Sequence, residues 1–347
     1  MPRSKAMNTA AARPVRFSRA QALLAACCAA ALLVSLGGCG VRLAAPPTTI
    51  PTLSPQAQLR DELSRREAAI SKGALALIAP ASTATPAPSS AVGASDTELT
   101  RLASRSQDRL TALGGVWTPW PQGAPPGADA GPAPRPLPAD QSALLAELEL
   151  AVKAAQVATA QEADPALTQL YASLYVSYSL DADALATALQ QPRAAQGPEG
   201  VSAPAAPSAA APGSESTTTP VVLSATATDA LFQLQWYTEN AAMRADEDEQ
   251  QRLLAAAADT RTQLTDSLRG GGPGPRTLSF PFDSSSSDQQ WVQQAAVTAT
   301  DALLADLVAS PAGSPARQAL LARLLHTART ARDFGISPTE LLPLSPL

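Results

Sequence analysis

Residues 287–307 read SDQQWVQQAAVTATDALLADL, and this stretch decides the fold because its pattern recurs along the chain. Ser287 is followed three residues later by Gln290, which is the spacing of a helix capping box. Apolar side chains then recur every three or four residues, at Val292, Ala296, Ala299, Leu303 and Leu307. This spacing places them on one face of a helix, so the stretch is predicted to be an amphipathic α-helix.

Seven other stretches begin with a polar capping residue and continue with an apolar stripe at helical spacing. They start at Ser54, Ser95, Asp140, Asp164, Ser224, Asp246 and Ser314. Glycines close several of them, at 114–115, 270–272 and 335. The best strand candidates, 221–223 and 277–282, are short. We therefore predict an all-α protein with about four helices in each half, and antiparallel neighbours on short turns favour up-down bundles.

The composition excludes several classes of protein. The chain has 347 residues, with 25 basic and 30 acidic side chains, 3 Cys and 1 His. A single His and few Cys are incompatible with a zinc finger, an Fe–S protein or a site built from several His ligands. An acidic chain without a basic stripe is a poor binder of nucleic acid, so no nucleic-acid partner is expected.

The N-terminus has the pattern of a secretory signal. Five basic residues and no acidic one lie in residues 1–19, an apolar run follows over 20–36, and Leu36-Gly37-Gly38-Cys39 comes next. This ending resembles a bacterial lipoprotein signal, which implies cleavage after Gly38 and a diacylglycerol on the Cys39 sulfur. An uncleaved membrane anchor is the alternative, since the run is at the lower length limit for a membrane span.

The composition along the chain predicts five regions. Residues 1–38 are the signal peptide and 39–53 a lipidated tether, followed by an N-terminal helical region at 54–191. Residues 192–219 are rich in Pro, Ala, Ser and Thr and are expected to be a disordered linker. A helical bundle is expected at 220–342. The mature chain carries 20 basic and 30 acidic residues, a formal charge of −10.

The C-terminal half resembles the ferritin-like domain of unknown function found in actinobacterial lipoproteins. Four segments carry the resemblance: 235–240 (QWYTEN), the acidic turn 246–249 with its following helix, 278–281 (LSFP) and 328–335 (ARTARDFG). The scarcity of Lys beside abundant Ala and Pro, a bias of GC-rich codons, agrees with such a source. The resemblance implies a ferritin-like four-helix bundle in this half, with further helices in the N-terminal half.

The chain departs from the metal-binding members of that class. A di-iron bundle takes Glu from two helices and Glu-x-x-His from the other two, and this sequence contains no Glu-x-x-His. The metal ligands are therefore expected to be lost. Glu239 and Asp301 are the candidates for a remnant carboxylate pair.

Three further features have both a structural and a functional interpretation. The acidic run 246–249 fits a helix start, where the helix dipole favours carboxylates, or a Ca²⁺ site. His326 fits a packed or rim histidine, or a general base. Trp117 and Trp120 either cover an end of the N-terminal bundle or form a contact patch for glycan or protein.

These observations predict a cell-envelope lipoprotein on the extracytoplasmic face of the membrane, acting as a non-catalytic helical interaction or scaffold module. Its expected partners are the membrane, through the lipid, and an envelope protein or glycan. Two alternatives stay open: a ferritin-like oxidoreductase or metal-storage protein, and a ligand-binding lipoprotein that serves a transporter. No catalytic residue, resident metal or cofactor besides the lipid on Cys39 is predicted.

Overall fold

The computed structural model describes residues 49–78, 94–129, 131–191, 221–277, 280–281, 286–337, 341–342 and 344. The predicted signal peptide, its cleavage position Gly38, the lipidation residue Cys39 and the linker at 192–219 lie outside these residues. The described part is helical without a strand, which confirms the all-α prediction. None of its helices is both long enough and apolar enough to cross a membrane.

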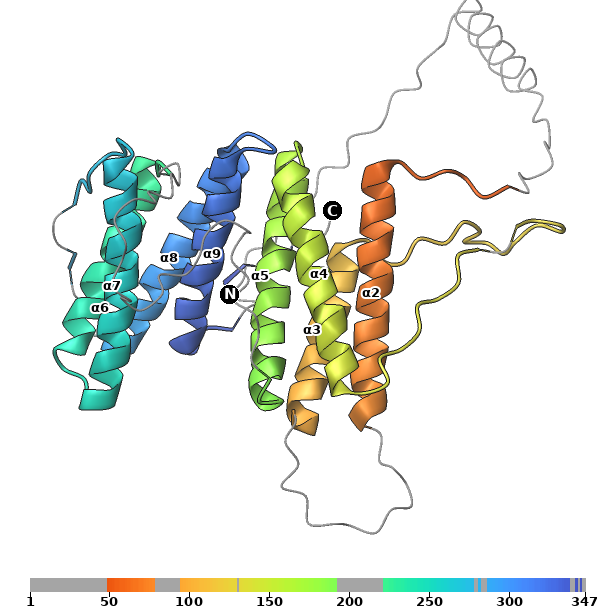
Figure 1. Ribbon diagram of the computed structural model, residues 1–347, viewed down its shortest axis with the longest axis horizontal. Helices are drawn as coiled ribbons and strands as arrows, with labels where there is room; N and C mark the ends of the chain where they lie inside the picture. The colour runs from red at the N-terminus through yellow and green to blue at the C-terminus, as the bar shows by residue number, and fades with distance from the viewer. Residues whose placement is uncertain are drawn as a thin grey trace, which may run out of the picture. The chain divides into compact units, whose positions relative to one another are not determined.

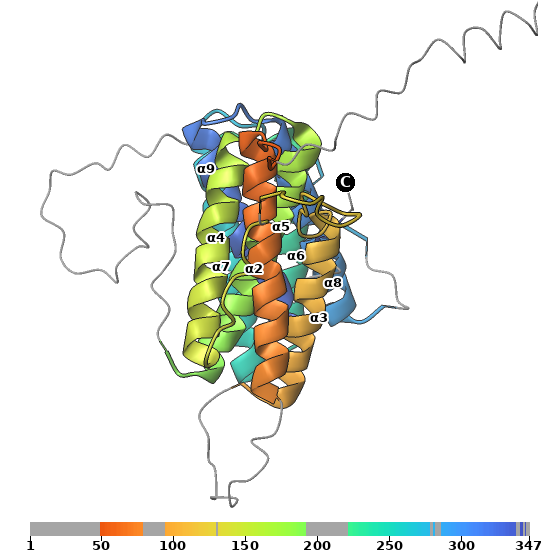
Figure 2. The same ribbon diagram turned by 90° about the vertical axis from the view of Figure 1, so that its right-hand side faces the viewer.

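The described residues form eight helices (Figures 1 and 2). They are α2 (Pro55–Ile78), α3 (Asp96–Ala112), α4 (Gln141–Gln161), α5 (Pro165–Ala188), α6 (Ala225–Ala242), α7 (Glu247–Arg269), α8 (Asp288–Ala309) and α9 (Pro315–Asp333). The chain divides into two compact units. One comprises 52–118 with 132–347 and holds all eight helices, and the other comprises 1–51 with 119–131.

The polar caps predicted from the sequence begin the helices. Ser95 and Ser287 each form a complete capping box, in which the cap side chain accepts from the third helical amide and the third side chain accepts from the cap amide. Five other caps, Asp140, Asp164, Ser224, Asp246 and Ser314, accept the same amide through their side chains. Local sequence therefore determines where these helices start.

The N-terminal bundle consists of α2, α3, α4 and α5. Gln56 at the start of α2 donates to Glu162 just after α4 (3.2 Å), so these two helices are antiparallel. The amide of Ala94, before α3, donates to Gln141 Oε1 at the start of α4 (2.8 Å). α3 and α4 therefore run in the same direction, and the chain between them returns to the end of the bundle where α3 begins.

The C-terminal bundle of α6, α7, α8 and α9 has the same connectivity. The amide of Ser224 at the start of α6 donates to Asp306 near the end of α8 (2.8 Å). Arg244, after α6, pairs with Asp288 at the start of α8 (2.6 Å). α6 is therefore antiparallel to α8, and α7 runs parallel to α8. Short turns give antiparallel neighbours, as expected, but the longer connection 270–287 crosses the bundle, so the expected up-down order is not kept throughout.

The two bundles pack against each other within the helical unit, through α5 against α8 and α9. The buried Arg317 in the first turn of α9 donates to the carbonyls of Thr159 (3.3 Å) and Glu162 at the end of α4. The amide of Gly313 donates to the Ala160 carbonyl (2.7 Å). These bonds satisfy carbonyls that the end of α4 leaves unpaired, and they join the two bundles within the helical unit.

Candidate functional site

A cluster of charged side chains lies inside the N-terminal bundle. Glu67 on α2, Arg109 on α3 and Asp181 on α5 have side chains that are 0 %, 0 % and 1 % exposed. Charged residues are almost never fully buried unless they are paired. The burial of three of them at one level of a bundle makes this cluster the candidate functional site.

Arg109 is the centre of the cluster. Its Nη1 lies 2.7 Å from Asp181 Oδ2, and its Nε lies 3.2 Å from Glu67 Oε1. The guanidinium also donates to the hydroxyls of Ser177 (2.9 Å) and Ser106 (3.0 Å). The Tyr178 ring stacks beneath it, 4.8 Å from the guanidinium carbon. One cation therefore connects three of the four helices of this bundle.

Burial and the neighbouring charges shift the pKa values in this cluster. Burial raises the pKa of Glu67 above its ordinary value, although Arg109 opposes the shift. Burial alone lowers the pKa of Arg109, but the carboxylates of Glu67 and Asp181 outweigh it, so the net pKa of Arg109 is raised. Burial beside Glu67 raises the pKa of the Tyr178 phenol well above its usual value. Arg109 thus keeps its charge, whereas burial disfavours the charged forms of Glu67 and Tyr178.

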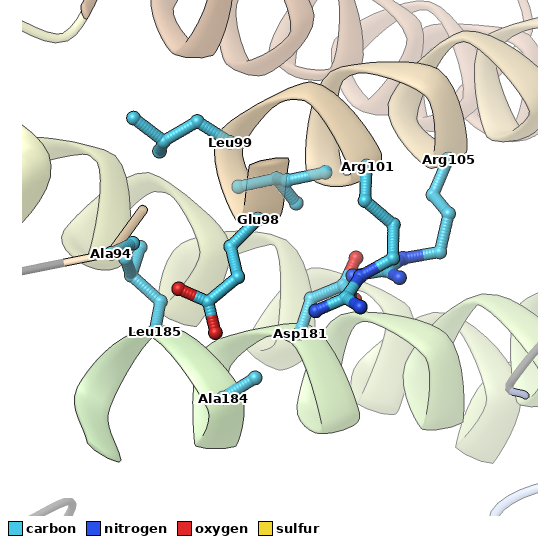
Figure 3. A pocket seen from close by; sticks show the side chains of 9 residues that line it. Ala94, Glu98, Leu99, Arg101, Arg105, Asp181, Ala184 and Leu185 are labelled. Atoms are coloured by element: carbon cyan, nitrogen blue, oxygen red, sulfur yellow. The ribbon is translucent and has the colours of Figure 1, made fainter. Parts of the chain in front are cut away.

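A small pocket leads from the surface to this cluster (Figure 3). Arg101 and Arg105 extend from α3 toward Asp181 on α5, and Glu98 lies nearer Ala184. Arg105 Nη2 lies 2.5 Å from Asp181 Oδ1, so Asp181 is shared by two arginines. The pocket has a volume of about 20 Å³, which is room for one water molecule. It is too small to admit an organic substrate.

The cluster does not fit a metal ion. Ferritin-like metal sites are built from inward-pointing carboxylates and Glu-x-x-His pairs. Here two carboxylates do point inward from α2 and α5, but the guanidinium of Arg109 lies between them and neutralises them. Within the described residues, no group of three or more His, Cys, Asp or Glu side chains could hold a metal.

The structure does not bring Glu239 and Asp301 together in a metal-binding group of that kind. Glu239 on α6 forms an ion pair with Arg261 on α7 and accepts a hydrogen bond from Gln235 (2.9 Å). Asp301 on α8 is exposed, and partial desolvation of its carboxyl group raises its pKa. Glu239 therefore connects two helices of the C-terminal bundle.

The acidic run and His326, also singled out by sequence, are in contact with neighbouring groups of the protein. The acidic run begins α7, where Asp246 is the cap and accepts from the Glu249 amide (3.0 Å). His326 lies on the exposed side of α9, with its Nε2 3.5 Å from Asp259 Oδ2 on α7. Both side chains line an open groove of about 780 Å³ between α7 and α9 that carries charges of both signs.

The two tryptophans belong to different units. The backbone of Trp117 receives a hydrogen bond from Arg65 (3.0 Å) and donates one to Asp61 (2.9 Å), in the helical unit. The indole of Trp120 donates to the Asp129 carbonyl (3.3 Å) in the smaller unit. Both side chains are half-buried, and a contact patch made by this pair stays a prediction.

Sequence reasoning missed the ionic cluster, although a signal for it existed. Glu67 lies four residues after Leu63 and three before Ile70, on the apolar stripe of α2. Asp181 follows Tyr178 by three residues on the stripe of α5, and Arg109 follows Ser106 by three on α3. A charged residue in register with an apolar stripe is expected to be buried. Two buried carboxylates and one buried guanidinium are then expected to pair with each other.

We predict that Arg109→Met destabilises the protein by about 3–5 kcal/mol, because it leaves two buried carboxylates without their shared cation. Chemical denaturation with urea measures the change in the free energy of unfolding. Arg101→Met, eight residues earlier on α3 and exposed, is the matched control and should change stability by about 0.5 kcal/mol or less. Equal effects of the two substitutions would contradict a structural role for the cluster.

The raised pKa of Glu67 predicts a specific dependence of stability on pH. The folded state keeps the Glu67 proton to a higher pH than the unfolded state, so this group's contribution to stability falls as pH rises from about 4 through the raised folded pKa. Glu67→Gln removes that loss. Its stability relative to the wild type should therefore increase with pH, by about 1.4 kcal/mol for each unit of pKa difference.

Urea denaturation of both proteins between pH 4 and pH 8 measures this difference. Glu62→Gln, five residues earlier on α2 and largely exposed, is the control, and its difference from the wild type should change little over the same range. Parallel stability curves for wild type and Glu67→Gln would contradict the raised pKa of Glu67.

Known proteins offer no direct guide to this site. Comparisons with protein-family models, with curated proteins and with solved structures find no match to the chain.

Proposed function

We propose that this chain is a lipid-anchored protein of the cell envelope whose helical body is a non-catalytic interaction or scaffold module. The sequence supplies the anchor, through the signal pattern that ends at Gly38 and the following Cys39. The observation that carries the non-catalytic part is the ionic cluster. Inside the N-terminal bundle, Arg109 is buried between its own counter-ions, Glu67 and Asp181.

The contacts of the cluster support this interpretation. Two hydroxyls, two carboxylates and one aromatic ring surround the Arg109 guanidinium. The Arg109 side chain is fully buried and its ion pairs lie inside the protein, so it does not face a substrate. Its effect is to hold α2, α3 and α5 in one relative register, which suits a body that presents fixed surfaces.

The junction between the bundles supports it as well. Arg329 on α9 forms an ion pair with Asp183 on α5 (2.8 Å), and Arg317, at the other end of α9, contacts the end of α4. A body whose two bundles are joined at two places holds the surface patches of both bundles in a fixed arrangement. A fixed arrangement of surface patches suits a scaffold that holds its partners at set positions.

The anchor is tested by replacing the predicted lipidation residue. In a bacterial host that processes lipoproteins, the wild type should incorporate labelled palmitate and fractionate with membranes. Cys39→Ser should lose both properties, because the oxygen of Ser does not accept the lipid. Cys28→Ser is the matched control and should behave as the wild type, since Cys28 lies in the segment expected to be removed. A membrane-bound, labelled Cys39→Ser protein would overturn the anchor.

The non-catalytic part is tested against the ferritin-like alternative by metal analysis. Purified chain from metal-replete medium should contain iron and manganese at background level, because Arg109 neutralises the buried carboxylates of the N-terminal bundle and Arg261 pairs with Glu239 of the C-terminal bundle. Mass spectrometry of the intact chain and of Arg109→Met measures the content of both. About two metal ions per wild-type chain would overturn the scaffold proposal and favour a ferritin-like function.

A further inference from the structure

A groove outside the ionic cluster lies between α2 and the segments that flank the α3–α4 connection. Its cationic lining residues are Arg65, Lys72 and Arg135, and its apolar lining includes Ala68, Val116 and Leu137. Its volume is about 490 Å³, within the range of small-molecule sites in proteins. No acidic side chain lines it, although acidic residues outnumber basic ones in this chain.

The walls of the groove are fixed by specific contacts. Gly73 on α2 lets the chain before α4 approach closely, because a Cβ at this position would lie 2.6 Å from Pro138 Cδ. The guanidinium of Arg65 donates to the carbonyls of Trp117 (3.0 Å) and Pro132 (3.3 Å). Arg65 thereby joins both flanks of the connection to α2. The shape of the groove is therefore determined by specific contacts.

The charges of the groove are unequally compensated. Arg65 Nε lies 2.7 Å from Asp61, and Arg135 lies 3.5 Å from Glu147, so each arginine has a carboxylate partner outside the lining. Lys72 is exposed and forms no ion pair among the described residues. One ammonium group beside an apolar surface is the single net charge that a ligand would meet.

We propose that this groove binds a single-chain amphiphile with one carboxylate, such as a fatty acid. The carboxylate would meet the Lys72 ammonium, and the hydrocarbon chain would cover Ala68, Val116 and Leu137. A single uncompensated cation matches a monoanion better than a doubly charged phosphate. A hydrocarbon chain on the apolar lining would bury apolar surface and so add to the binding free energy of the charged group. This site is independent of the covalent anchor.

Lysine reactivity tests the proposal, because the chain has only Lys5, Lys72 and Lys153. The protein is the full chain with Cys39→Ser, which lacks lipid of its own. Reductive methylation followed by peptide mass spectrometry measures each amine separately. Monomeric dodecanoate should protect Lys72 and leave Lys153, exposed on α4, unchanged. Acetate and dodecyltrimethylammonium, which supply the head group or the chain alone, should protect neither.

Substitutions give a second measurement. In equilibrium dialysis with radiolabelled dodecanoate, Lys72→Glu should weaken binding at least about tenfold, which corresponds to about 1.4 kcal/mol. Lys153→Glu is the charge-matched control and should bind as the parent does, and Lys72→Arg should retain binding. Equal thermal unfolding midpoints will show that the variants are folded.

Three results would overturn the proposal. Lys72 and Lys153 would be protected equally if dodecanoate binds without a specific site. Acetate or the cationic amphiphile would protect Lys72 if the acyl chain or the carboxylate were dispensable. Unchanged affinity in Lys72→Glu would remove Lys72 from the site. None of these results bears on lipidation of Cys39, so the two proposals fail independently.

Discussion

The ion pairs of Arg109 with Glu67 and Asp181 are the interaction on which the N-terminal bundle depends. Moving these three charges out of water costs several kcal/mol for each ion, and their mutual attraction offsets this cost only when the geometry is good. Apolar side chains of the same volume would be about as stable. What the charges add is selectivity, because a helix that slides by one turn separates a buried carboxylate from its partner.

The same connectivity is stabilised by different chemistry in the C-terminal bundle. There, Tyr237 stacks on Trp291 with ring centroids 5.1 Å apart, and Phe280 from the connection packs against the Tyr237 ring at 6.0 Å. The Tyr237 hydroxyl donates to the Pro281 carbonyl (2.9 Å). Aromatic contacts thus hold this connection to its bundle, whereas Arg65 has that role in the N-terminal half. A long connection needs such a fastening because its closure is entropically unfavourable.

Helix starts could be predicted from sequence because caps are local. Ser95 and Ser287 satisfy amides only three residues away, so their effect needs no knowledge of the rest of the chain. The parallel course of α7 and α8 could not be predicted in this way, since it depends on contacts such as that of Ser224 with Asp306, 82 residues apart. The junction formed by Arg317 is likewise a contact between carbonyls and a side chain with no pattern in sequence.

The candidate site could be predicted from the sequence only in part, less than the local helix caps and more than the long-range contacts. The stripe positions of Glu67, Arg109 and Asp181 are visible in the sequence, but which carboxylate meets which cation depends on how the helices pair. Glu239, a candidate for the remnant carboxylate pair, is paired with Arg261 from the next helix, and this partner could not be predicted from the sequence. Composition restricts what a site can contain, and packing decides which of those residues meet.

α2 connects the buried cluster with the surface. Glu67 points inward to Arg109, while Arg65 and Lys72 line the groove on another face of the same helix. Arg66, between Arg65 and Glu67 in the sequence, pairs with Glu147 of α4 (2.5 Å). Because these residues are on one rigid helix, rotation of α2 about its axis would break the buried ion pairs before it could turn the groove residues away. The buried charges therefore determine which side chains α2 presents at the surface, even though no ligand reaches them.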